Sequence, residues 1–266
     1  MPILCYHSVS PDWKSPLSVS PAAFDQQCRW LSQRRNVVDL GTAVDQMTSR
    51  GNLSGQLAAV TFDDGFVDLY EHALPILLRH KIPCTIFLVA ETLLRSNPKV
   101  HWVDDPPSTP LKVLSLDQVR EMRDMGIQFG SHSYSHHDLT QLSDYECELD
   151  LRESRILLED LLGTPIRFLA YPRGLQNERV RKAARKAGFS NAFSMMRKPR
   201  IMDTHSIPRV GIYSHNGRFT LEVKMSPWYV PAKMGTLFAP GAPAPSAMGK
   251  SSGNGRLPGN GVAEVR

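Results

Sequence analysis

The chain has 266 residues, of which 41% are hydrophobic and 21% charged, a composition typical of a globular protein with one large α/β domain or two small ones. The formal net charge of +5 is mildly basic, which fits an anionic or envelope-associated partner without requiring one. No run approaches about 18 consecutive apolar residues, which excludes a membrane span of the usual kind.

Short apolar runs rich in β-branched residues recur along the chain and predict strands. We expect them at 3–6, 58–62, 84–90, 127–130, 167–171, 191–195 and 207–212. Helical patterns lie between them, at 21–34, 40–50, 68–80, 115–126, 143–163 and 177–188. Several of these begin at Ser, Asp or Asn and several end at Gly, as helices do.

Strands that alternate with helices predict a parallel α/β architecture. A closed or distorted barrel fits better than an open Rossmann sheet, because no G-x-G-x-x-G follows the first strand and no P-loop is present. In barrels the active site lies where strands end and the following loops begin. We therefore expect the reactive residues at the carboxyl ends of the strands.

Two segments depart from this alternation. Residues 95–114 are Pro-rich and predict a long loop, which in a compact domain is often functional. From Ala239 onward the chain is rich in Gly, Pro, Ser and Ala. We expect a folded domain over 1–238 and a disordered tail over 239–266.

The first two predicted strands end in polar residues that can carry chemistry. ILCY runs directly into His7, and VTFDDGF places Asp63 and Asp64 before Gly65. Two adjacent carboxylates after a strand are costly to bury without a cation. An Asp-Gly turn with a helix cap is the alternative, and this motif alone does not separate the two.

The segment FGSHSYSHHDLT carries His132 and His136 immediately after the strand at 127–130. Positions four apart lie on one face of a helical turn, so these imidazoles and a carboxylate from another strand would form a metal site. Such sites hold zinc or a similar divalent ion and keep one position open for water. A polar loop that is rich in His by chance is the alternative. His137 points elsewhere on a helical turn and is not expected to be a ligand.

A third motif, RFLAYPRG, again passes from strand to turn. Pro172 and Gly174 shape a tight loop whose backbone N–H groups could point into a site. On its own the motif is merely a turn. The coincidence of all these residues at strand ends is much more specific than any one of them.

TFDDG, HSYSH and a Pro-Gly loop after a strand resemble the motifs of the NodB-like polysaccharide deacetylases, carbohydrate esterase family four. ILCYHSV and FLAYPRG are more similar to the circularly permuted branch, which includes the poly-N-acetylglucosamine deacetylases. The resemblance covers residues 3 to 213 approximately. It implies a distorted (β/α)₇ barrel, in a single domain, that hydrolyses N-acetyl groups from amino sugars.

The resemblance also implies a role for each matching residue. The residues that match metal ligands are Asp64, His132 and His136. Asp63 matches the catalytic base, the backbone amide of Arg173 the oxyanion donor, and His7 the general acid of the permuted branch. The expected substrate contacts are Tyr171, Pro172 and Trp102, the last as a ring that stacks on sugars or as a residue that packs the long loop onto the barrel.

The chain departs from the family's pattern in two places. Most relatives carry an arginine that orients the base two residues before the proline of the third motif, but here that residue is Ala170. The candidates to replace it are Arg173, Arg167 and Arg209, of which Arg209 is slightly favoured because its strand would face the site; an ordinary salt bridge is the alternative. The family's late histidine is also missing, and His205 is better interpreted as a loop residue, which leaves the general-acid role to His7.

Two other function classes stay open at this level. A metal-dependent amidase acting on a non-sugar amide would use the same ligands, and a catalytically silent carbohydrate-binding protein would share the fold. Nucleic acid is not an expected partner, because the basic residues of 179–186 lie on a predicted helix whose apolar face packs inward.

The expected partner is an N-acetylated glycan, and the expected cofactor is a divalent metal ion, zinc first, with cobalt, nickel or iron as alternatives. The four cysteines form no C-x-x-C pair and are expected to be buried free thiols. The first residues do not form a signal peptide, so the chain is expected to be cytoplasmic by default, whereas the family resemblance favours the envelope or secretion.

Overall fold

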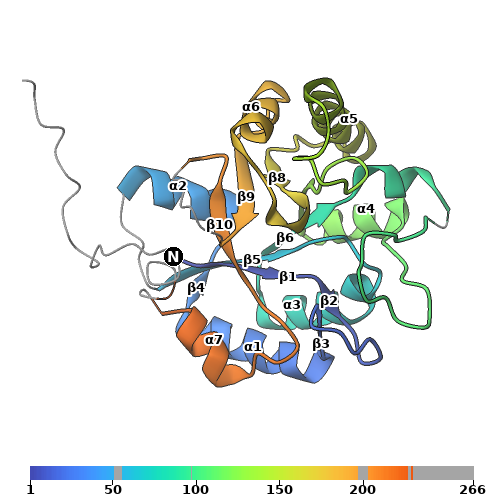
Figure 1. Ribbon diagram of the computed structural model, residues 1–266. Helices are drawn as coiled ribbons and strands as arrows, with labels where there is room; N and C mark the ends of the chain where they lie inside the picture. The colour runs from blue at the N-terminus through green and yellow to red at the C-terminus, as the bar shows by residue number, and fades with distance from the viewer. Residues whose placement is uncertain (51–55, 97, 197–202, 227–228, 230–266) are drawn as a thin grey trace, which may run out of the picture.

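Seven parallel strands close into a ring in the computed structural model, which describes residues 1–50, 56–96, 98–196, 203–226 and 229 (Figure 1). In ring order, which is also chain order, the strands are β1 (Ile3–Tyr6), β5 (Leu57–Phe62), β6 (Cys84–Leu88), β7 (Gln128–Ser131), β8 (Phe168–Ala170), β9 (Asn191–Met195) and β10 (Ile207–Gly211). The ring closes because β1 pairs with both β5 and β10. It is distorted, since β1 and β5 share four register pairs whereas β7 and β8 share one. The predicted distorted barrel is confirmed.

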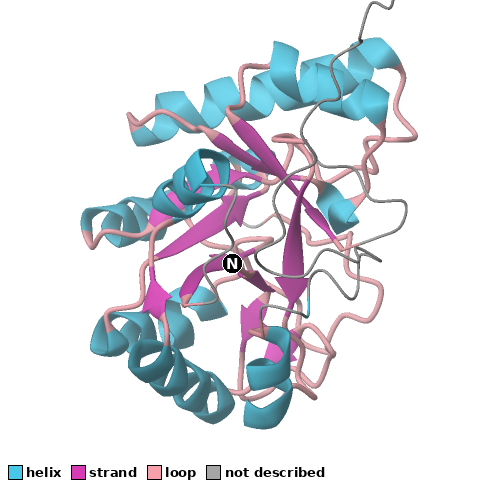
Figure 2. Cartoon of the chain, turned by 90° about the vertical axis from the view of Figure 1, so that its left-hand side faces the viewer, coloured by secondary structure: helices cyan, strands magenta, loops and turns pink. Residues whose placement is uncertain are grey.

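Helices surround the ring, as Figure 2 shows with strands in magenta and helices in cyan. They are α1 (Pro21–Arg34), α2 (Leu40–Arg50), η1 (Leu69–Ala73), α3 (Leu74–His80), η2 (Ala90–Leu94), α4 (Leu116–Asp124), α5 (Asp144–Leu162), η3 (Pro172–Gly174), α6 (Glu178–Lys186) and α7 (Arg218–Lys224). Ser115 and Ser143 cap α4 and α5 with reciprocal capping boxes, which satisfy backbone N–H groups at both helix starts.

The side chains of most barrel strands alternate between two apolar clusters, because successive residues of a strand point to opposite faces. Ile3 and Ala59 belong to a cluster inside the ring, and Leu4 and Val60 to a larger one between the strands and the helices. Both faces of these strands are therefore buried, as in other parallel sheets covered by helices.

The structure differs from the sequence prediction mainly where local signals are short. Residues 69–73 form a π-helical turn before α3, since Pro75 has no N–H to donate to the preceding turn. The two-residue strands β2 (Ser8–Val9), β3 (Ser18–Val19) and β4 (Asn36–Val37) and the seven-residue α7 were not expected. The predicted tail at 239–266 lies outside the described residues, and no helix within the described part is long and apolar enough to cross a membrane.

Candidate active site

The alternation of β1 and β5 places reactive residues at one end of the ring interior. Ile3 pairs with Ala59 and Cys5 with Thr61, so His7 and Asp63 continue the same two inward-facing rows past the strand ends. Arg209 is the third residue of β10 and is fully buried. Four side chains from three neighbouring strands, Cys5, His7, Asp63 and Arg209, therefore meet at the carboxyl end of the barrel.

Asp63 and Arg209 form a bidentate ion pair at this point. Arg209 Nη1 donates to Asp63 Oδ1 and Nη2 to Oδ2, both at 2.7 Å, and Nη1 also donates to Thr61 Oγ1 at 3.1 Å. The Cys5 thiol donates to Asp63 Oδ2 at 3.4 Å. Burial alone would raise the pKa of Asp63, but Arg209, with His132 and His7 nearby, lowers the pKa of Asp63 well below its usual range. Asp63 is therefore held ionised.

Asp64 turns away from this pair toward two imidazoles. Its Oδ1 lies 3.3 Å from His136 Nε2 and 3.7 Å from His132 Nε2. The turn needs a left-handed backbone, with φ of 71° at Asp64 and 64° at Gly65. A Cβ on Gly65 would lie 2.7 Å from Leu88, so this close packing also favours glycine.

The segment with the two histidines is a loop, so the expected helical turn is wrong. Ser133 and His136 adopt left-handed conformations, with φ of 69° and 60°. Side-chain oxygens hold the loop, because the backbone N–H of His136 donates to Ser133 Oγ at 2.9 Å and that of Tyr134 donates to Oδ1 of Asp150, on α5, at 2.9 Å. The expected convergence of His132 and His136 nevertheless occurs, with ring centroids 4.8 Å apart.

Hydrogen bonding and burial give the imidazoles the form that ligates metals. His132 Nδ1 lies 2.8 Å from the carbonyl oxygen of Ala170; an N–H at this position donates to that oxygen and leaves the Nε2 lone pair facing Asp64. Burial lowers the pKa of His132 and of His136, so both rings are neutral near pH 7. His136 Nδ1 is buried without a hydrogen-bond partner among the described residues.

Asp64, His132 and His136 fit a divalent cation. Burial, and then the charge of Asp63, raise the pKa of Asp64 to about 8, so its ionised form requires an additional positive charge. Two neutral imidazoles and one carboxylate are a donor set that zinc accepts, with room for a further ligand. Cys5, His7 and Asp63 form a second cluster of suitable atoms, but Arg209 already neutralises the carboxylate there.

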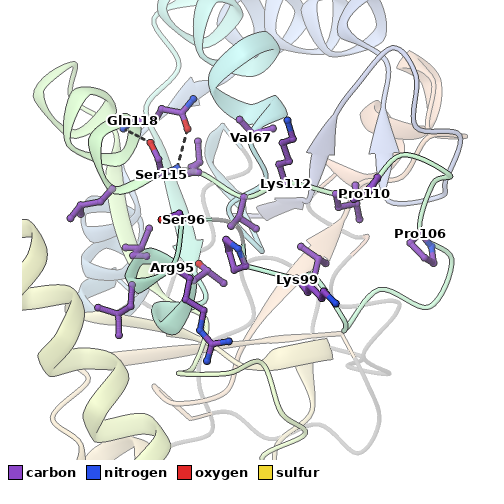
Figure 3. A pocket seen from close by; sticks show the side chains of 18 of the residues that line it. Val67, Arg95, Ser96, Lys99, Pro106, Pro110, Lys112, Ser115 and Gln118 are labelled. Atoms are coloured by element: carbon purple, nitrogen blue, oxygen red, sulfur yellow. Dashed lines mark hydrogen bonds between the residues drawn. The ribbon is translucent and has the colours of Figure 1, made fainter.

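Asp64, His132 and His136 line a cavity of about 300 Å³ together with Asp63 and His7. Its walls are formed by His7, Leu17, Asp63, Asp64, Trp102, Val103, Asp104, His132, His136, Arg173, Gly174, Met195 and Tyr213. Figure 3 shows a larger cavity, of about 810 Å³, between the long loop and the start of α4. No carboxylate, imidazole or thiol of the described residues lines that larger cavity, so the chemistry belongs to the smaller one.

Comparisons with known proteins agree with this geometry. The family model described as polysaccharide deacetylase matches residues 50–192, more than half of the chain. The chain belongs to the polysaccharide deacetylase family. The NodB-like resemblance drawn from the motifs is confirmed.

Two curated relatives and one solved structure show the extent of the similarity. YxkH of Bacillus subtilis is 28% identical over 190 residues, which are 71% of this chain and 62% of YxkH, so this chain spans less than two thirds of that relative. The poly-beta-1,6-N-acetyl-D-glucosamine N-deacetylase of Staphylococcus aureus is 27% identical over 205 residues, 73% of this chain and 67% of that protein. The deacetylase PplD of Streptococcus pyogenes superposes with a TM-score of 0.73 at 22% identity, covering 85% of this chain and 98% of PplD, which supports the shared fold.

Arg209, one of the three arginines expected to orient the base, donates hydrogen bonds to both carboxylate oxygens of Asp63. Arg167 lies at the opposite end of β8, with its guanidinium 5.3 Å from the Phe168 ring centroid. The Arg173 side chain forms a bidentate pair with Asp104 instead. The arginine that reaches Asp63 therefore comes from β10 and not from the position of Ala170 at the end of β8.

Two of the predicted substrate contacts are not in the cavity. Tyr171 is fully buried, and its hydroxyl donates to the carbonyl oxygen of His205 at 2.9 Å. Pro172 is also buried, at the start of η3. Their side chains pack in the turn that carries Arg173 and do not line the cavity of about 300 Å³, and a direct contact of either residue with substrate stays a prediction. His205 lies in a loop, as expected, with Nε2 2.9 Å from the carbonyl oxygen of Phe189.

We expect the affinity of Asp64, His132 and His136 for zinc to depend on pH. Below about pH 8 the metal-free protein holds a proton on Asp64, which an incoming ion must displace, whereas the two imidazoles have none to lose. Zinc affinity should therefore rise by about tenfold per pH unit up to about pH 8 and then level off. Isothermal titration at pH 6, 7 and 8, in buffers of different ionisation enthalpy, would show it; equal affinity at all three values would contradict the account of Asp64.

Proposed function

We propose that this protein removes N-acetyl groups from amino sugars of a polysaccharide or glycoconjugate, in a reaction that requires a divalent metal ion, zinc first. The observation that carries the proposal is a cavity lined by Asp63, Asp64, His132 and His136. Arg209 is buried behind this cavity and pairs with Asp63. The name of the Staphylococcus aureus relative supports an N-acetylglucosamine polymer as substrate.

Asp64, His132 and His136 would hold the ion. A divalent ion bound there acts as a Lewis acid toward the acetamide oxygen and lowers the pKa of a bound water. The chain itself keeps both imidazoles neutral and fixes the orientation of His132 through Ala170.

Asp63 would be the general base. It accepts a proton from the water that attacks the acetyl carbon, and Arg209 holds both of its oxygens so that the carboxylate cannot rotate out of position. The same guanidinium keeps Asp63 ionised against the effect of burial, so the base is ready near neutral pH.

The backbone amide of Arg173 would stabilise the oxyanion. Arg173 adopts a left-handed conformation in the turn after β8, with φ of 54°, and lines the cavity. A backbone N–H donor of this kind typically stabilises the transition state by about 3 kcal/mol. The side-chain pair with Asp104 holds the strained turn in place.

His7 would deliver a proton to the leaving nitrogen as the C–N bond breaks. Burial lowers the pKa of His7 to about 4, so its imidazole is neutral near pH 7 in the resting protein. An imidazole with an ordinary pKa would be partly protonated at that pH. His7 Nδ1 is buried without a hydrogen-bond partner among the described residues, and one of its ring nitrogens lies within 4.8 Å of an Asp63 oxygen. His7 is thus placed to take up the proton that Asp63 receives and to pass it on.

His7→Ala should leave metal binding intact and lower turnover by about 100-fold or more, since it removes a proton donor and no ligand. His137→Ala is the matched control, because His137 is exposed and next to a proposed ligand. Acetate release and metal content of the two purified variants would be compared. Turnover of His7→Ala equal to that of His137→Ala would remove His7 from the mechanism.

Acetate release from a panel of N-acetylated glycans, with and without added zinc, tests the proposed function. We expect acetate and free amine in equal amounts from at least one N-acetylglucosamine oligomer. Acetate from none of the glycans, with zinc bound, would overturn the proposal in favour of a non-sugar amide substrate. Glycan binding without any acetate release would indicate a binding protein.

A further inference from the structure

Trp102, in the long loop, contacts two of the three proposed metal ligands. Its indole Nε1 donates to Asp64 Oδ1 at 3.0 Å. Its ring stacks on His136, with centroids 5.1 Å apart and planes inclined by 22°. Only 8% of Trp102 is exposed. His136 covers one face of the indole, and the Asp64 carboxylate accepts the hydrogen bond of its Nε1–H.

Arg173, in the turn after β8, holds the backbone around Trp102. Arg173 Nη2 donates to the carbonyl oxygen of Trp102 at 3.0 Å and to Asp104 Oδ1 at 2.8 Å, and Nη1 donates to Asp104 Oδ2 at 3.0 Å. One guanidinium therefore binds the residue on each side of Val103. This contact fixes the loop over the metal-ligand cluster.

We propose that Trp102 is a positioning residue of the metal site, which orients Asp64 through its indole N–H and His136 through its ring, with Arg173 holding it there. The inference rests on the proposed metal site and replaces the sugar-stacking role expected for Trp102. A carboxylate oxygen can accept the indole bond and still face the imidazoles, because it has two lone pairs.

Trp102 can orient Asp64 because few other hydrogen bonds of the described residues fix this carboxylate. Trp102 Nε1 donates a hydrogen bond to the Asp64 carboxylate, and Asp64 has a left-handed backbone conformation. Without the indole, the carboxylate and the His136 ring would each gain freedom that metal binding must then remove. Loss of such outer contacts typically weakens metal affinity by about 10- to 100-fold.

The test compares zinc affinity of the wild type, Trp102→Phe and Trp13→Phe by competition with a chromophoric chelator. Phenylalanine keeps an aromatic ring against His136 but removes the N–H. Trp13 is the matched control, since it is also buried and its Nε1 donates to the same loop, at the carbonyl oxygen of Asp105 3.4 Å away. We expect affinity to fall by about 10- to 100-fold in Trp102→Phe and to stay unchanged in Trp13→Phe.

A wild type that takes up no zinc would contradict the proposed function itself. Zinc bound equally tightly by the wild type and Trp102→Phe would overturn only the inference. If Trp102→Phe does not fold, indole N–H resonances of the wild type carry the test. Zinc should shift the Trp102 indole signal and leave that of Trp13 in place, and an unmoved Trp102 signal would overturn the inference.

Discussion

Asp63→Asn is expected to bind zinc as the wild type does and to release acetate about 10²- to 10⁴-fold more slowly. The amide keeps the shape of the side chain but cannot accept a proton from water. Asp64, His132 and His136 are unchanged, so the ion should remain. The measurement is initial rate of acetate release together with metal content of the same preparation.

The control for this variant is its stability, because asparagine also weakens the pairing of Arg209. A thermal unfolding midpoint well above the assay temperature, with full zinc content, would assign the loss of activity to the missing base. Wild-type turnover in Asp63→Asn would show that another group activates the water, and the proposed mechanism would be wrong.

Arg209→Met is expected to lower the free energy of unfolding by about 3–5 kcal/mol, because it leaves the Asp63 carboxylate buried without its partner. The variant also removes the strongest of the charges that oppose burial, so the pKa of Asp63 should rise and turnover near neutral pH should fall sharply. Urea unfolding and acetate release measure the two effects.

Two further variants separate charge from geometry at Arg209. Arg209→Lys keeps the charge but loses the bidentate contact with Asp63. This variant should therefore be more stable than Arg209→Met but should still release acetate slowly. The double variant Asp63→Asn with Arg209→Met removes both charges and should recover part of the lost stability. An Arg209→Met protein as stable as the wild type would contradict the account of the buried pair.

Much of the fold could be predicted because most strands and helices have strong local signals. The expected ranges for α1, α2, β1 and β9 match the structure, and the alternation of inward and outward residues puts His7 and Asp63 side by side. The π-helical turn before α3 and the two-residue strands could not be predicted, since they depend on tertiary contacts rather than on a periodic pattern.

The site was predictable in its residue types but not in its connections. The DDG and HSYSH motifs identified the carboxylates and imidazoles from local sequence. The contact between Arg209 and Asp63 spans 146 residues of chain and exists only because the barrel closes between β10 and β5 through β1. The pKa of His7 and the contact of Trp102 with Asp64 depend on burial in the same way, which sequence spacing does not reveal.

The most direct test of the central claim is a zinc titration of the chelator-stripped protein, with acetate release from an N-acetylglucosamine oligomer followed at each step. We predict no release before zinc is added, a rise with each addition, and a plateau at one ion per chain. Release that is unaffected by the chelator, or absent at every zinc ratio although zinc is bound, would contradict a metal-dependent deacetylase.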